Sequence, residues 1–302
     1  MSTPYVQTVN TNILGEGPHW RASTGDLYYV DIGRNAVHRY NPATGQNTKV
    51  NIGGAWGVSL VIPVEGENNR FVISNGHDLQ FMVWDGISPE PSSLTTFASV
   101  EPEYPQARWN DGKCDSMGRL FAGTSSETGQ PTGALYRITQ GEVSRMVVGI
   151  TISNGIAWNS SNTLMYYIDT PTRRVDVFDY DITTGNISNR RPLYDFAAMG
   201  ENGDPDGMTI DANGNLIVGC WGGSKMIHIN PVTGQKIRTV NFPTSNITSG
   251  AFAGPNLSTL YVTSANVGLS EIELNSQPAA GSLFQVTNFG VTGQAAGNAY
   301  RP

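Results

Sequence analysis

Four residues with oxygen-bearing side chains occupy nearly the same phase of a repeating strand pattern. Glu16, Asn110, Asn154 and Asp206 each lie 11 or 12 residues before the central aromatic or aliphatic residue of a similar strand. Equal phase in a repeat protein places residues at equivalent points of the architecture, so we expect the four to converge on one site. Two carboxylates and two amide carbonyls are oxygen ligands suited to a hard divalent cation. The spacing therefore predicts a metal site.

The local sequence around the four residues supports this interpretation. They occur in LGEGPHW, RWNDGK, ISNGIAW and DPDGMTI, each with a glycine one or two residues later. Glycine permits close backbone approach and unusual φ angles. The alternative is that such pairs are ordinary turn residues, but the shared phase favours a site. A charge of about −2 from Glu16 and Asp206 suits Ca²⁺ first, with Mn²⁺, Mg²⁺ or Zn²⁺ as alternatives.

The elements that must position these residues form an internal repeat. A short apolar run with strand character recurs six times, with central residues 43 to 51 residues apart, and a second strand follows most copies. The runs are GDLYYVD (25–31), NRFVISNG (69–76), GRLFAGT (118–124), NTLMYYIDT (162–170), GNLIVGCW (214–221) and STLYVTSA (258–265). Such units predict an all-β fold, a six-bladed β-propeller with four-stranded blades around a central channel. A β-sandwich is the alternative.

In such a propeller the four residues would lie near the start of innermost strands, at one mouth of the channel. Ser59 and Ser249 occupy the same phase in the other two units and are weaker ligands. The N-terminal segment YVQTVN could complete the blade formed by the C-terminal repeat. We expect residues 1–302 to form a single propeller domain, because no linker or composition break divides them.

Composition excludes several functional classes. The net charge of −7 argues against binding to nucleic acid or anionic membranes. The N-terminus lacks signal-peptide features, and no apolar stretch could span a bilayer. Cys114 and Cys220 alone make no disulfide framework. We therefore expect a cytoplasmic protein. Nucleophile-elbow, dinucleotide and P-loop motifs are absent from the sequence. The four histidines lack metal-ligand spacing and are expected to be structural. The sequence leaves oligomeric state open.

Several segments also carry a family resemblance. LGEGPHW, RWNDGKCDSMGRLFAGT, ISNGIAW, MYYIDT, PDGMTIDANGNL and NPVTGQKI resemble the regucalcin (senescence marker protein) and gluconolactonase family over nearly the whole chain. The resemblance implies a six-bladed propeller with one divalent metal on its axis. It implies metal ligation by Glu16, Asn154 and Asp206, with Asn110 near the metal and in contact with substrate. Arg108 matches the family's substrate-binding arginine.

One loop departs from the family pattern. Regucalcin members carry an acidic pair after the AGT segment that contacts substrate, whereas this chain reads AGTSSETGQPTG, with Glu127 followed by Thr128. Glu127 is therefore our candidate for the acidic substrate contact.

The hypothesis from these observations is metal-dependent hydrolysis of a lactone, a small-molecule cyclic ester. Asp206 is the candidate general base, and Arg108 and Asn110 would orient substrate oxygens. Two alternatives stay open. The segments LVIPVEG, WDGISPEP and ASVEP resemble the insect branch of the family, which includes firefly luciferin-regenerating enzyme, and suggest conversion of oxyluciferin. A calcium-binding regulatory role without catalysis is the other.

Overall fold

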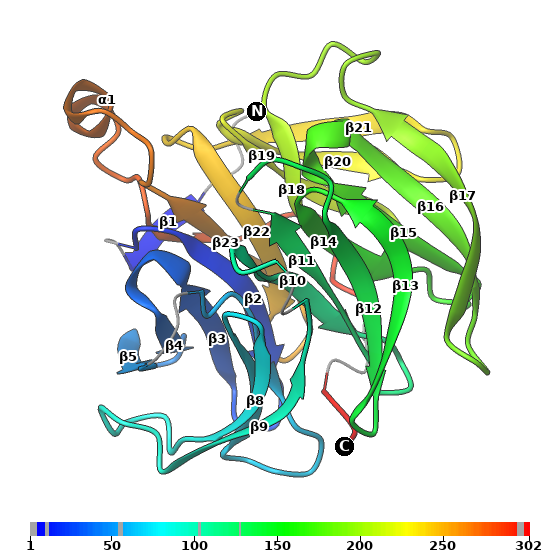
Figure 1. The fold of residues 1–302 in the computed structure, drawn as a ribbon. Helices are drawn as coiled ribbons and strands as arrows, with labels where there is room; N and C mark the ends of the chain where they lie inside the picture. Colours follow the sequence, from blue (N-terminus) through cyan, green and yellow to red (C-terminus); the bar gives the residue numbers. More distant parts are fainter. Residues whose placement is uncertain (1–4, 10–11, 54–56, 102–103, 127, 295–298) are drawn as a thin grey trace.

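The computed structural model describes residues 5–9, 12–53, 57–101, 104–126, 128–294 and 299–302. Within these ranges, the strands form six antiparallel sheets of four strands each. The sheets follow one another around a ring as the blades of a six-bladed β-propeller (Figure 1). The predicted fold is confirmed.

Five blades are built from consecutive strands, the first of each lying innermost. They are β2 (Gly15–Arg21), β3 (Asp26–Asp31), β4 (Ala36–Asn41), β5 (Gln46–Asn51); β6 (Val61–Pro63), β7 (Arg70–Asn75), β8 (Asp78–Val83), β9 (Ser93–Ser99); β10 (Ala107–Cys114), β11 (Leu120–Ser126), β12 (Gly133–Thr139), β13 (Glu142–Ile150); β14 (Ser153–Trp158), β15 (Leu164–Asp169), β16 (Arg174–Asp181), β17 (Asn186–Asp195); and β18 (Asp204–Ile210), β19 (Leu216–Trp221), β20 (Lys225–Asn230), β21 (Gln235–Asn241).

The sixth blade joins the two ends of the chain. It contains β22 (Asn246–Ala253), β23 (Thr259–Ala265), β24 (Leu283–Val286) and, outermost, the N-terminal strand β1 (Tyr5–Val9). β1 pairs antiparallel with β24, with Tyr5 opposite Val286. The ring is thus closed by backbone hydrogen bonds between residues far apart in sequence, as the N-terminal segment predicted.

The strand runs identified from the sequence are the second and third strands of the blades. β3 reads as a continuous apolar run because all six of its residues are buried. In β16, Phe178 and Tyr180 pack into one core cluster, and between them Asp179 lies on the other face. The third strands end at turns such as Asn41–Gly45, where Gly45 has a φ of 71°.

The outermost strands were not predicted. β5, β13, β17 and β21 are largely exposed and polar, so they lack the apolar signal of the inner strands. Two short 3₁₀ turns, η1 (Ile32–Arg34) and η2 (Thr170–Thr172), and one helix, α1 (Glu271–Ser276), were also not predicted. A capping box between Ser270 and Glu273 starts α1. No helix in the described ranges is long and apolar enough to cross a membrane.

The core lies between adjacent sheets, where large side chains stack across blade boundaries. Trp109, Phe121, Tyr167 and Phe284 are fully buried in such clusters. Tyr300, near the C-terminus, is also fully buried and stacks on Phe97 with ring centroids 5.9 Å apart. The two ends of the chain are therefore both part of the packed structure.

Candidate metal and substrate site

Five of the predicted site residues lie on innermost strands, and a repeated irregularity positions them: Glu16, Arg108, Asn110, Asn154 and Asp206. The pairing of each innermost strand with its neighbour shifts register at Glu16/His19, Trp109/Gly112, Ser153/Ile156, Pro205/Met208 and Ile247/Gly250. Each shift is a β-bulge, which bends a strand and re-aims its side chains. Glu16, Asn110, Asn154 and Asp206 lie within or at the edge of these bulges. The expectation that they fall near the start of innermost strands is confirmed.

The glycines that follow the site residues let the innermost strands approach closely. A Cβ on Gly155 would lie 2.6 Å from Met208 Cβ and 2.9 Å from the Asp206 carbonyl oxygen of the next blade. A Cβ on Gly207 would collide with the Ser249 side chain. In both cases φ lies outside the left-handed region, so close approach, rather than φ, requires glycine here.

Two carboxyl groups from different blades meet in the channel. Glu16 and Asp206 are 9% and 6% exposed. Burial and the charge of Asp111 raise the pKa of Glu16 to about 8. Burial and the nearby charges of Glu16 and Asp111 raise the pKa of Asp206 well above its ordinary value, and a hydrogen bond links it to Glu16. Two buried carboxyl groups with the charge of a third nearby favour bound protons or a bound cation.

An amide chain connects the remaining predicted residues across three blades. Arg108 Nη1 donates to Asn110 Oδ1 at 2.6 Å. Asn110 Nδ2 donates to Asn154 Oδ1 at 3.2 Å, and Asn154 Nδ2 donates to Thr170 Oγ1 at 2.8 Å. Thr170 in turn donates to the carbonyl of Pro205, directly before Asp206. The chain fixes the orientation of both amides and links Asn154, through Thr170, to the backbone directly before Asp206.

Sequence reasoning missed Asp111. Successive residues of a regular strand face opposite sides of a sheet. The bulge between Trp109 and Gly112 breaks this alternation: Asn110 bonds Asn154, while the charge of Asp111 acts on Glu16 and Asp206. Burial also raises the pKa of Asp111. The Asn-Asp-Gly sequence was the available signal. In a regular strand, however, side chains alternate between the two faces, so only one of Asn110 and Asp111 would be expected to face the channel.

The two serines in phase with the site have different surroundings. Ser59 donates to the carbonyl of Trp109 at 2.8 Å and shares a hydrogen bond with Ser74, so its hydroxyl joins neighbouring blades. Ser249 is buried, and its side chain fills the space next to Gly207. Both act in packing the innermost strands together.

Glu127, the predicted acidic substrate contact, lies outside the described residues. The loop around it borders a pocket of about 410 Å³ lined by Tyr104, Ala107, Ser126, Thr128 and neighbouring residues. None of the five described site residues lines this pocket.

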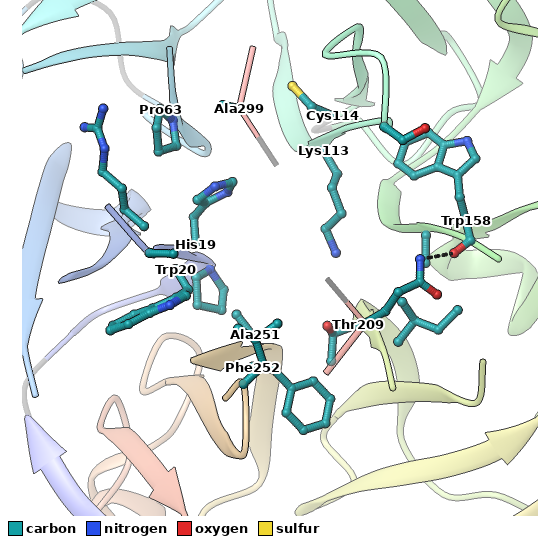
Figure 2. Close-up of a pocket in the computed structure, with 18 of the residues that line it drawn as sticks. His19, Trp20, Pro63, Lys113, Cys114, Trp158, Thr209, Ala251, Phe252 and Ala299 are labelled. Carbon is teal, nitrogen blue, oxygen red and sulfur yellow. Dashed lines mark hydrogen bonds between the residues drawn. The ribbon is translucent and has the colours of Figure 1, made fainter. Parts of the chain in front are cut away.

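A larger cavity of about 520 Å³ lies elsewhere. It is lined by the later residues of the innermost strands and the turns that follow them, including His19, Lys113, Trp158, Thr209 and Phe252 (Figure 2). These residues come three or more positions after the site residues on the same strands. Cavity size alone therefore does not identify the site of Glu16 and Asp206. The stronger criterion for that site is its group of titratable side chains with raised pKa values.

The candidate site offers a cation two carboxylates and amide oxygens. Across the described residues, no three His, Cys, Asp or Glu side chains are grouped as metal ligands. A cation here would therefore need an amide oxygen in addition to Glu16 and Asp206, and Asn154 can supply one. The donor set is all oxygen, which fits a hard divalent ion.

The sequence matches a known family model. The model of the SMP-30/Gluconolactonase/LRE-like region matches residues 14–266, which include every predicted site residue. This chain belongs to that family. The resemblance seen in the sequence motifs is thus confirmed.

Individual members of the family are similar over almost their whole length. Regucalcin of Xenopus laevis is 37% identical over 289 residues, with 93% of each chain covered. A Bacillus subtilis protein named "Putative sugar lactone lactonase YvrE" is 36% identical over 274 residues, with 90% of each chain covered. A solved luciferin-regenerating enzyme matches with a TM-score of 0.94 and 37% identity, covering 99% of this chain and all of that one.

Proposed function

We propose that this family member is a divalent-metal-dependent hydrolase of lactones. The observation that carries the proposal is the buried pair of Glu16 and Asp206, beside the hydrogen-bonded Arg108–Asn110 pair. Buried carboxyl groups with strongly raised pKa values cluster at functional sites. The similarity to a protein named as a sugar lactone lactonase supports the substrate class.

Glu16, Asn154 and Asp206 would hold the cation. When bound, a divalent ion would supply Lewis-acid polarisation of the lactone carbonyl, and Ca²⁺ is the first candidate because every donor is oxygen. The amide chain through Asn110 and Thr170 keeps Asn154 in place without rearrangement. Arg108 and Asn110 would orient the ring and carbonyl oxygens of the substrate by hydrogen bonding.

Asp206 would act as general base. Its raised pKa reflects an environment in which the carboxyl group readily holds a proton. It would accept a proton from the water that attacks the carbonyl carbon, and the ring oxygen leaves as the alcohol of the hydroxy acid product. General-base assistance is typically worth about 10²–10⁴-fold in rate.

The test uses metal-free protein reconstituted separately with Ca²⁺, Zn²⁺, Mn²⁺ or Mg²⁺. Proton release from a panel of aldonolactones is then measured for the unmodified chain and for Asp206→Asn. We expect metal-dependent turnover that the substitution reduces by about 10²-fold or more. Turnover that persists fully in the variant with metal bound would remove Asp206 as the base.

A second candidate function has a specific observation behind it. The similarity to luciferin-regenerating enzyme extends over 99% of this chain, so oxyluciferin belongs in the same assay under identical metal conditions. Turnover of oxyluciferin without lactone turnover would favour that activity. Ca²⁺ binding at micromolar concentration without turnover of either substrate would favour the calcium-binding role suggested by the regucalcin relatives.

A further inference from the structure

The far-mouth cavity is the 520 Å³ space lined by the ends of the innermost strands, and it has the features of a second binding site. Ligand pockets commonly measure about 300–1,000 Å³. Figure 2 shows His19 and Lys113 on opposite sides of the space, with the Lys113 side chain running toward Thr209. The bulges separate these residues from Glu16 and Asp206, so the cavity is distinct from the proposed metal site.

Lys113 gives the cavity a positive charge. Its ammonium donates to the Met208 carbonyl at 2.7 Å. In the part of the chain that the structure describes, Lys113 forms no ion pair with a carboxylate; burial lowers its pKa, and the charge of Asp111 opposes this. An ammonium group has three donors, and one hydrogen bond leaves two for a ligand.

Two other basic residues line the cavity, Arg21 and His19. The Arg21 guanidinium is a second positive charge, but it donates to the carbonyls of Glu67 and Asn68. Burial and the charge of Lys113 lower the pKa of His19 to about 3, so its imidazole is neutral at physiological pH. The cavity therefore presents the Lys113 ammonium, a guanidinium already bonded to backbone carbonyls, and neutral polar groups, the imidazole of His19 and the hydroxyl of Thr209.

Apolar side chains make up much of the remaining wall. Trp20, Trp158 and Phe252 line it, together with small residues such as Ala251. The Gln294 side chain donates to the Trp158 carbonyl at 3.3 Å and so joins the wall to the C-terminal segment (Figure 2). Flat aromatic walls beside an ammonium group with unused donors suit a ligand with a flat apolar body and one anionic group.

We propose that the far-mouth cavity binds a small organic carboxylate with a flat apolar body. Lys113 would pair with the carboxylate, His19 or Thr209 would hydrogen bond to it, and the aromatic residues would contact the body. The nearby charge of Asp111 and the net charge of −7 favour a monoanion over a polyanion such as a nucleotide. The proposal does not depend on lactone hydrolysis or on the bound metal.

Indole-3-acetate is the probe, with indole-3-acetamide as its neutral analogue. Both are titrated by calorimetry into the Ca²⁺-loaded full-length chain. We expect one carboxylate to bind per chain, at least about tenfold more tightly than the amide, since a charge-assisted hydrogen bond is lost in the amide. Equal binding of the two, or no binding of the carboxylate at millimolar concentration, would overturn the proposal.

Variants then locate the site. Lys113→Met should weaken indole-3-acetate binding at least about tenfold. Two control variants should leave the affinity for indole-3-acetate unchanged. They are Lys49→Met, which removes an exposed lysine, and Asp206→Asn at the proposed metal site. Unchanged binding in Lys113→Met, or loss in Asp206→Asn, would exclude the far-mouth cavity. Because Lys113 also bonds Met208, the melting temperature of each variant is recorded. The comparison of indole-3-acetate with indole-3-acetamide uses the unmodified chain, so it still tests the proposal if Lys113→Met fails to fold.

Discussion

At the scale of single residues, the candidate site is defined by acidic side chains whose negative charge the nearby basic side chains offset only in part. The charge of Asp111 raises the pKa of Glu16, and the charges of Glu16 and Asp111 raise the pKa of Asp206. Arg108 opposes this at Glu16, and Lys113 at Asp111, but burial dominates in both. A divalent cation or bound protons would relieve the repulsion, and these two possibilities lead to separate predictions.

The first prediction concerns metal affinity. Glu16→Gln keeps the shape of the side chain but removes one negative charge from the proposed ligands. We expect Ca²⁺ affinity, measured by calorimetric titration, to fall at least about tenfold, since ligand charge tunes affinity at oxygen sites. Glu90→Gln, which removes an exposed carboxylate, is the matched control. An unchanged titration in Glu16→Gln would argue against a metal at this position.

The second prediction concerns pH and the metal-free protein. The pKa of Glu16 is about 8 in the folded chain, against an ordinary value of 4.5. Between these two values the folded state binds more protons than the unfolded state, so the free energy of unfolding should fall as pH rises from about 5 to about 8. The raised pKa of Asp206 acts in the same direction.

Urea unfolding in excess chelator measures this slope. Glu16→Gln should show a shallower fall in stability across the same interval, because Glu16 no longer loses its proton there. A metal-free protein whose stability rises toward pH 8, or a variant with the same slope as the unmodified chain, would contradict the assigned pKa shifts.

At the scale of elements, the bulged innermost strand is the unit that makes the site. Five of the six innermost strands shift register at the corresponding place, and the glycine after the site residue lets neighbouring strands touch. The short β6 pairs with β7 in continuous register, and there Ser59 precedes the strand and bonds to Trp109. Site geometry therefore depends on close packing between blades as well as on the ligands themselves.

The third prediction tests this packing. In Gly207→Ala the new methyl group would collide with Ser249, and overpacking typically costs about 1–3 kcal/mol. We expect that loss in the free energy of unfolding, together with weaker metal binding, because β18 must move and carries Asp206. Gly53→Ala is the control: a Cβ there meets nothing within 4 Å. Equal stability of the two variants would show that the close approach is not required.

The sequence predicted the inner strands and four site residues because both leave periodic signals. Buried strands are apolar, and the residues at the channel recur at one phase. It could not predict that Asn110 and Asp111 both act in the channel, because a bulge depends on pairing with another strand. The outer strands β5 and β17 were missed because exposed strands need no apolar pattern. The far-mouth cavity was missed because His19 and Lys113 come together only when the ring closes.

At the scale of the whole molecule, the blades depend on one another for burial. Core clusters cross blade boundaries, and Tyr300 fills a space between Phe81 and Phe97 of one blade and Tyr136 of the next. We therefore propose that residues 1–302 form one cooperative domain.

The fourth prediction tests that cooperativity. Tyr300→Ala should lower the free energy of unfolding by about 3–5 kcal/mol, the usual cost of truncating a large buried aromatic residue. Tryptophan fluorescence and circular dichroism should shift together in a single transition. Val232→Ala, at a residue that is 92% exposed, should change little. Separate transitions from the two probes would indicate that blades unfold independently.

The pairing of β1 with β24 also constrains how the chain folds during synthesis. Residues 5–9 are synthesised well before their partners, Leu283 to Val286. Until those partners exist, β1 has no sheet to join, and the sixth blade lacks its outer strand. A circular permutant that begins at Asn12 and carries residues 5–9 after Pro302 would still have to bring that strand back to β24. Completion of the sixth blade therefore waits for the synthesis of β24.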